Sequence, residues 1–165
     1  MNISGINYES VVDGQGIRVV VYVSGCAHNC EGCHNPSSHP FDAGIEFSEK
    51  LQDDVIKYVK DRKFISGITI SGGDPMYSAD EVSQFVSRFK EEVPDASVWI
   101  YSGFRYEDII TRKDMANLLY MCDVLVDGKF VLECRDMTLP YRGSQNQRVI
   151  DIQKTREIGK VVFFK

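Results

Sequence analysis

The sequence lacks long hydrophobic segments, clusters of basic residues and a signal-like start. Its longest uncharged apolar run, Val19–Val23, is far shorter than the roughly 20 residues that span a bilayer. No run of Lys or Arg exceeds two residues, and the net charge is −5, so a nucleic-acid groove held by charge is not expected. The first residues have neither a basic region nor an apolar stretch. We therefore expect a cytoplasmic protein that binds neither membranes nor nucleic acid.

Internal repeats, low-complexity tracts and linkers are also missing from the 165 residues. A chain of this length can hide about 70% of its unfolded surface in one core. Hydrophobic residues make up 43% of the chain and charged residues 26%, which is ordinary for a globular protein. We expect a single domain spanning residues 1–165.

The cysteines are the unusual feature of the composition. Their number, five, is odd, which disfavours a fully paired disulfide framework. Cys26, Cys30 and Cys33 lie within eight residues, and three thiolates so close together suit an iron–sulfur cluster or zinc. For zinc, one of three nearby histidines would complete the set: His28, His34 or His39. Uncoordinated thiols are a third possibility.

Two further cysteines, Cys122 and Cys134, stand apart from this group. We expect each to be a small buried hydrophobic residue, because free cysteine is often used in that way. Their positions in the sequence also allow either one to act as a distant fourth ligand.

Apolar runs alternate with helical patterns along the chain. Strands are predicted at 17–23, 67–71, 97–101 and 123–126, with further candidates at 148–152 and 161–164. The first predicted helix runs from Ser48 to about Asp61. The second follows a capping box at Ser78–Glu81 and ends before Pro94, and a helical stretch extends from Ile109 to Leu119.

This alternation predicts an α/β fold with parallel strands and crossover helices. Six strands are too few for a closed eight-stranded barrel, so we expect an open or partial parallel β/α barrel. Ligands in such folds bind at the carboxyl ends of the strands. Four segments that directly follow strands should gather there: the cysteine loop, Gly72–Pro75, Ser102–Gly103 and Asp127–Gly128.

Gly72–Pro75 is the second candidate site. Two glycines allow the backbone to approach a ligand closely, and the carboxylate of Asp74 could accept a hydrogen bond from a ligand amine. A tight turn that leads into the next helix explains the same residues without a ligand. Asp127 and Lys129, which also follow a strand, fit either a cofactor contact or a solvated turn. Asp13–Gly16 precedes a strand rather than a helix, so we interpret it as a turn and not as a phosphate loop.

In combination, Cys26-x3-Cys30-x2-Cys33 and Gly72–Pro75 resemble the radical S-adenosylmethionine superfamily. Four further blocks are similar to the family that activates anaerobic ribonucleoside-triphosphate reductase: Val23–Cys26, Gly32–Asn35, Leu125–Phe130 and Arg142–Ser144. The resemblance covers nearly all of the chain from Asp13 to Arg148. The tail after Asp151 lies outside it and is given no role.

The resemblance implies a [4Fe–4S] cluster held by Cys26, Cys30 and Cys33, with S-adenosylmethionine on the fourth iron. One electron cleaves this cofactor, and a 5′-deoxyadenosyl radical takes hydrogen from a glycine of the reductase large subunit, a glycyl-radical protein. The electron comes from a donor such as a flavodoxin. No side chain acts as an acid–base catalyst. By position, the resemblance assigns the methionine amino group to Gly72, Gly73 and Asp74. It places Gly32 and His34, which flank Cys33, against the cofactor.

Many superfamily members have an aromatic residue before the third cysteine, where this chain has Gly32. Glycine is what the reductase-activating branch would show there, and the packing of the adenine is left unassigned. Two other functions are kept open. One is activation of another glycyl-radical enzyme of the formate-lyase type, and the other is a non-catalytic interaction module that binds zinc.

Overall fold

A single seven-stranded sheet organises the molecule, which we describe from a computed structural model of residues 1–165. The order of the strands is β3-β1-β2-β4-β5-β6-β7, and the two edge strands do not pair with each other, so the sheet is open. The strands are β1 (Asn2–Ser10), β2 (Ile17–Val23), β3 (Ile45–Glu46), β4 (Ile65–Gly72), β5 (Ser97–Ser102), β6 (Val124–Asp127) and β7 (Arg148–Asp151).

The centre of the sheet is parallel and its edges are antiparallel. Strands β2, β4, β5 and β6 pair in parallel, as expected for strands joined by helical crossovers. Strand β1 is antiparallel to both β2 and β3, and β7 is antiparallel to β6. The prediction of parallel strands is therefore wrong at the edges. The segment 128–147 between β6 and β7 has only a short 3-10 turn, Leu132–Cys134, in place of a crossover helix.

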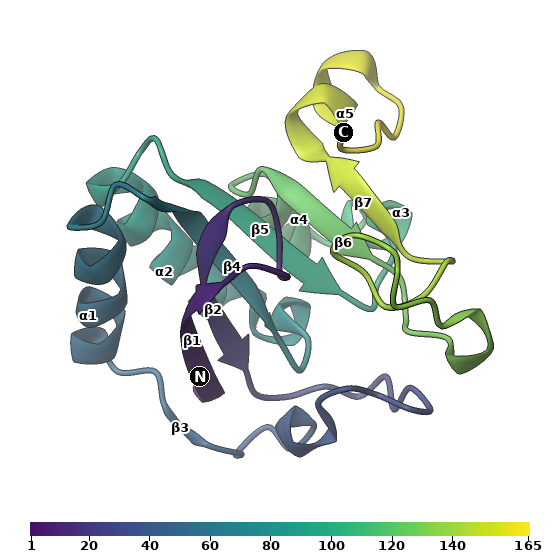
Figure 1. The fold of residues 1–165 in the computed structure, drawn as a ribbon, viewed down its shortest axis with the longest axis horizontal. Helices are drawn as coiled ribbons and strands as arrows, with labels where there is room; N and C mark the ends of the chain where they lie inside the picture. The colour runs from purple at the N-terminus through teal and green to yellow at the C-terminus, as the bar shows by residue number, and fades with distance from the viewer.

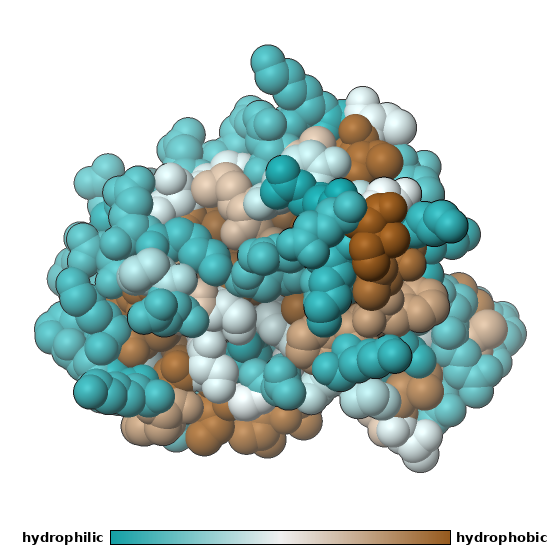
Figure 2. All heavy atoms as spheres, turned by 90° about the horizontal axis from the view of Figure 1, so that it is seen from above, coloured by the Kyte–Doolittle hydropathy of each residue, from teal (hydrophilic) through white to brown (hydrophobic).

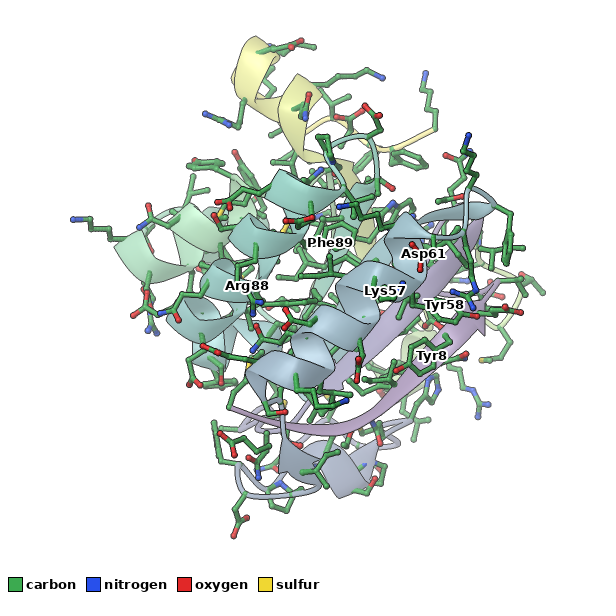
Figure 3. All side chains as sticks on the ribbon, turned by 90° about the vertical axis from the view of Figure 1, so that its left-hand side faces the viewer. Tyr8, Lys57, Tyr58, Asp61, Arg88 and Phe89 are labelled. Carbon is green, nitrogen blue, oxygen red and sulfur yellow. The ribbon has the colours of Figure 1, made fainter.

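The main hydrophobic core lies between the sheet and three helices, α1 (Glu49–Lys60), α2 (Ala79–Glu92) and α4 (Lys113–Leu119). In Figure 1 these helices lie to the left of the sheet and behind it. Figure 3 shows α1 beside α2, with Tyr58 of α1 facing Tyr8 of β1, and the centres of these two rings are 4.7 Å apart. Val82, Phe85 and Phe89 of α2 are buried in this core, as their spacing predicts.

The opposite face of the sheet has a smaller core of four buried residues, Trp99, Val124, Val126 and Val149. The C-terminal tail completes it, because the ring of Phe164 packs edge-on against Trp99 at 5.0 Å. The last helix, α5 (Ile152–Ile158), follows β7 directly and lies apart from the other helices. Figure 2 shows that hydrophilic residues cover most of the face seen from above, with hydrophobic patches divided between them.

Several predicted elements differ from the structure. Strands β1 and β3 were not predicted, and 161–164 forms only an isolated bridge between Phe163 and Ile150. The hydroxyl of Ser78 caps nothing, because a 3-10 turn (Pro75–Ser78) runs into α2 and the Asp74 carboxylate caps that turn. The stretch 109–119 is broken into α3 (Tyr106–Ile109) and α4. None of the helices has the length and hydrophobicity that a membrane crossing requires.

Candidate functional site

A cavity of about 630 Å³ lies at the carboxyl ends of the parallel strands. The four segments that follow the predicted strands all contribute to its wall, as the parallel topology of the central strands requires. Its lining includes Cys26, His28, Cys30, Cys33, His34, His39, Ser71, Gly72, Gly73, Tyr101, Ser102, Gly103, Gly128, Lys129 and Phe130.

The three clustered cysteines are all free thiols and all half-buried. Burial raises the pKa of the Cys26 thiol, and the nearby carboxylate of Asp74 acts in the same direction. A metal binds thiolate rather than thiol, so coordination at Cys26 has to release a proton. The loop thus offers all three sulfurs to one cavity, and its first thiol is the one whose thiolate form burial disfavours.

Three thiols on one loop provide the soft sulfur donors that an iron–sulfur cluster uses. No three His, Cys, Asp or Glu side chains are grouped as one metal ion would require. Zinc holds all of its ligands about 2.0–2.3 Å from a common point. A cluster accepts ligands that are further apart, because each thiolate binds a different iron. Three thiols, with one iron left to a further ligand, match this donor set.

The three histidines near the cysteines have different surroundings. Nε2 of His28 lies 2.6 Å from Oδ2 of Asp74, so this ring is already engaged away from the thiols. A ring nitrogen of His39 lies 3.3 Å from Sγ of Cys33. His34 is exposed at the cavity, and its ring lies 4.9 Å from that of Phe130.

The glycine pair is required by the close approach of two chain segments. A Cβ atom at Gly72, where φ is +107°, would lie 2.5 Å from the backbone of Val23. A Cβ atom at Gly73 would lie 2.5 Å from the carbonyl oxygen of Gly25. Both glycines also line the cavity. Their small size therefore allows the loop to pack on the end of β2, where it forms part of the wall.

Asp74 lies behind this wall rather than in it. Its side chain is 1% exposed. Oδ2 contacts His28 and accepts hydrogen bonds from Ser102 and Gly103, while Oδ1 accepts one from the amide of Met76. A direct contact between Asp74 and a ligand amine stays a prediction. The same holds for Gly32, which is exposed and faces Leu132 rather than lining the cavity.

The two other cysteines lie away from the cavity wall. Cys122 is buried in the main core, where its thiol donates to the carbonyl of Leu118, which confirms the prediction for this residue. Cys134 is half-buried and belongs to neither core.

Some polar contacts at this edge are not predictable from the local sequence. Asp127, at the end of β6, is 1% exposed and binds Arg148 and the amide of Tyr106, while Arg148 also pairs with Glu107. Lys129 is exposed at the cavity. The position of Ser102 at the end of a predicted strand indicates that it lies near the cavity, where it binds Asp74. Nothing in the local sequence indicates that Arg148 pairs with Asp127.

The fold and the thiol loop fit an α/β protein that holds an iron–sulfur cluster, and comparison with known proteins places the chain more closely. A family described as a 4Fe-4S single cluster domain matches residues 12–150. The chain is 39% identical over 140 residues to a protein of Haemophilus influenzae, covering 83% of this chain and 89% of the relative. For a Vibrio cholerae protein the identity is 40% with the same coverage. For one from Escherichia coli it is 34% over 142 residues, 84% of this chain and 91% of the relative.

All three relatives are named anaerobic ribonucleoside-triphosphate reductase-activating protein. The chain belongs to this family of 4Fe-4S proteins.

Proposed function

We propose that the chain activates an anaerobic ribonucleoside-triphosphate reductase, with a [4Fe–4S] cluster and S-adenosylmethionine as cofactors. One observation carries the proposal. Three free thiols of one loop open into the same cavity as Gly72 and Gly73, in a chain 34–40% identical to named activating proteins. The cavity volume, about 630 Å³, is that of a small-molecule site.

We assign Cys26, Cys30 and Cys33 as the cluster ligands, which leaves one iron for the cofactor. Gly72 and Gly73, which line the same cavity, would receive the methionine amino group of S-adenosylmethionine through their backbone. We give Asp74 the task of holding this loop, because four contacts already occupy its oxygens.

The residues beside the third cysteine would complete the cofactor site. His34 lines the cavity, and Gly32 precedes Cys33 without a side chain that could block it. When bound, the cluster and the cofactor supply the radical chemistry that removes a hydrogen atom from a glycine of the reductase. The protein's own task is to orient both groups and to keep competing hydrogen donors away.

The fold type, the electron donor and the cellular location complete the proposal. We infer that the open sheet is a partial barrel of the radical S-adenosylmethionine type, formed by one domain of residues 1–165. Its four parallel strands with the cavity at their carboxyl ends support this inference. We also infer a flavodoxin-like electron donor and a cytoplasmic setting, in which unpaired thiols persist.

Anoxic reconstitution with iron and sulfide tests the function. The wild-type protein should bind iron, turn brown, and release methionine and 5′-deoxyadenosine when reduced with S-adenosylmethionine. Cys30→Ala should lose both properties while staying folded. Cys134→Ser is the matched control, because this thiol lies away from the cavity, and it should keep both. A wild-type protein that binds zinc and no iron would falsify the proposal.

The identity of the partner needs a separate measurement. The reduced protein is incubated with the anaerobic reductase and, in parallel, with a formate-lyase-type enzyme, and the doublet of a glycyl radical is sought by electron paramagnetic resonance. The signal is expected on the reductase. A doublet on the formate-lyase-type enzyme alone would reassign the chain to the other kind of activase.

A further inference from the structure

The cysteine loop contains a buried side chain that is not one of its thiols. The side chain of His28, between Cys26 and Cys30, is 6% exposed. Its Nε2 atom lies 2.6 Å from Oδ2 of Asp74, which is 46 residues further along the chain. Enclosing a polar ring costs free energy unless it is hydrogen-bonded. The hydrogen bond between His28 and Asp74 offsets this cost, and it connects two loops of the chain.

The other partners of Asp74 are donors, which is consistent with His28 as the donor of this hydrogen bond. Oδ2 accepts from the amide of Gly103 at 2.8 Å and from the hydroxyl of Ser102 at 2.9 Å. The Ser102 oxygen itself accepts from the amide of Phe104, so its own hydrogen is free to point at Asp74. Oδ2 thus already acts as the acceptor toward two donors. We assign Nε2 of His28 as a third donor to this oxygen, at 2.6 Å.

Packing fixes the same ring sterically. The His28 ring meets the edge of Phe104 at 4.7 Å and an angle of 71°, and its centre lies 5.5 Å from that of Tyr77. A Cβ atom at Gly103 would lie 2.5 Å from the imidazole. The next residue, Asn29, has φ +49°, a left-handed conformation that asparagine tolerates. The middle of the cysteine loop thus has one defined position.

This contact joins the two walls on which the proposed function depends. Backbone bonds already tie Gly73 to Val23 and Asp74 to Gly25, but these reach only the start of the cysteine loop. His28 extends the attachment into the loop, between the first and the second thiol. Ser102 and Gly103 add the end of β5 to the same carboxylate.

We propose that the His28–Asp74 hydrogen bond is a lock that positions the cysteine loop against the Gly72–Gly73 loop before any cluster is bound. His28 is a positioning residue, which acts through the loop and is not a ligand. The lock itself stands on the contacts described above. Its consequence, a fixed arrangement of cluster and cofactor, rests on the proposed function.

The first test uses the metal-free protein and does not depend on that function. Hydrogen exchange of residues 26–33 is compared between the wild type and three variants. His28→Phe keeps an aromatic ring against Phe104 but loses the donor, and exchange should become faster. His28→Gln places a nitrogen near the Nε2 position, and exchange should stay close to that of the wild type. Glu31→Gln alters an exposed side chain of the same loop that does not line the cavity, and should leave exchange unchanged.

The second test uses the reconstituted protein. His28→Phe should retain its fold and most of its iron, but its affinity for S-adenosylmethionine, measured by equilibrium dialysis, should fall about tenfold, as expected for one charge-assisted hydrogen bond. Adding S-adenosylmethionine should also change the electron paramagnetic resonance spectrum of the reduced cluster less in His28→Phe than in the wild type. His28→Gln should restore both. If His28→Phe aggregates, His28→Asn, which is too short to reach Asp74, takes its place.

Two results would overturn the lock. One is wild-type exchange and affinity in the variants that lack the donor. The other is a folded His28→Gln protein as defective as His28→Phe, which would assign the effect to ring shape. A wild type that binds no iron would instead contradict the proposed function, while the exchange comparison would still decide the lock.

Discussion

Two buried charges, Arg18 and Asp74, lie at opposite ends of the same parallel strands. Arg18, near the start of β2, is fully buried and has no carboxylate partner. Its guanidinium donates five hydrogen bonds to neutral oxygens of Gln15, Ile68, Thr69 and Ser97. It also lies 5.4 Å from the ring centre of Trp99. Burial lowers the pKa of this guanidinium to about 10, so it is still charged at neutral pH.

Asp74 is equally buried, but it draws its partners from elsewhere. They come from the cysteine loop, from its own loop and from the segment after β5. The partners of Arg18 belong to strands β4 and β5 and to the turn before β2. Burial alone therefore does not reveal the structural role of a charge. The elements it joins do: Arg18 ties strands together, whereas Asp74 ties together the loops of a site.

Arg18→Met tests the first half of this comparison and should have the largest effect on stability. It leaves several buried oxygens without a donor, and we expect the free energy of unfolding to fall by about 3 kcal/mol. Urea denaturation measures this fall. Iron content per folded molecule should be unchanged. A loss of iron without a loss of stability would show that Arg18 supports the site and not only the strands.

Thr69→Val removes a single partner of Arg18. The hydroxyl of Thr69 accepts from Arg18 at 2.8 Å and donates to the carbonyl of Asp13 at 2.7 Å. Because valine has nearly the same shape and neither bond, stability should fall by about 2 kcal/mol. Thermal unfolding of the metal-free protein gives the value. Affinity for S-adenosylmethionine after reconstitution should equal that of the wild type.

Ser102→Ala is the matched change at the other end. This buried hydroxyl also makes two bonds, to Asp74 and from the amide of Phe104. We expect a smaller loss of stability, about 1 kcal/mol, since Asp74 keeps three other contacts. Affinity for S-adenosylmethionine should fall, unlike in Thr69→Val. Equal affinities in the two variants would remove the distinction between the two ends.

The smallest effect is expected from a charge pair at the cavity end that is not enclosed. Glu107 is about half-exposed, and its hydrogen bonds to Arg148 lower the pKa of its carboxyl to about 2. A depressed pKa stabilises the folded state above the ordinary value of 4.5, and this contribution is lost as pH falls towards 2. Glu107→Gln should therefore cost little at pH 7 and show a weaker decline in stability between pH 4.5 and 2. Urea unfolding at pH 7 and pH 3 compares the two proteins. A steep decline that persists in Glu107→Gln would point to other carboxylates.

What could be predicted from the sequence follows the same division. The run Ile17–Val23 is rich in β-branched residues, which identify a buried strand without knowledge of its neighbours. The three cysteines were found by their spacing. Strand β1 was missed because Asn2–Ser10 is polar and contains a glycine, and the pairing of its backbone with β2 and β3 outweighs these preferences.

The tail and the lock illustrate the limits of local patterns. Val161–Phe164 looks like a strand, but its last ring packs on Trp99, and a single bridge replaces the ladder. His28 and Asp74 are 46 residues apart, and neither carries a local sign of the other. Only the approach of the two loops, which the fold creates, brings them within hydrogen-bond distance.

The burial of Cys122 has a practical consequence. Its thiol is 2% exposed in the main core, and burial raises its pKa well above the usual range, so an alkylating reagent reaches it as a thiolate only when the core opens. The other four cysteines are half-buried and accessible to a reagent more directly. Mass spectrometry of the alkylated chain can therefore time the opening of the core at one cysteine while it counts protected thiols at the others. Cys122 thus serves as a built-in reporter of the rate at which the core opens.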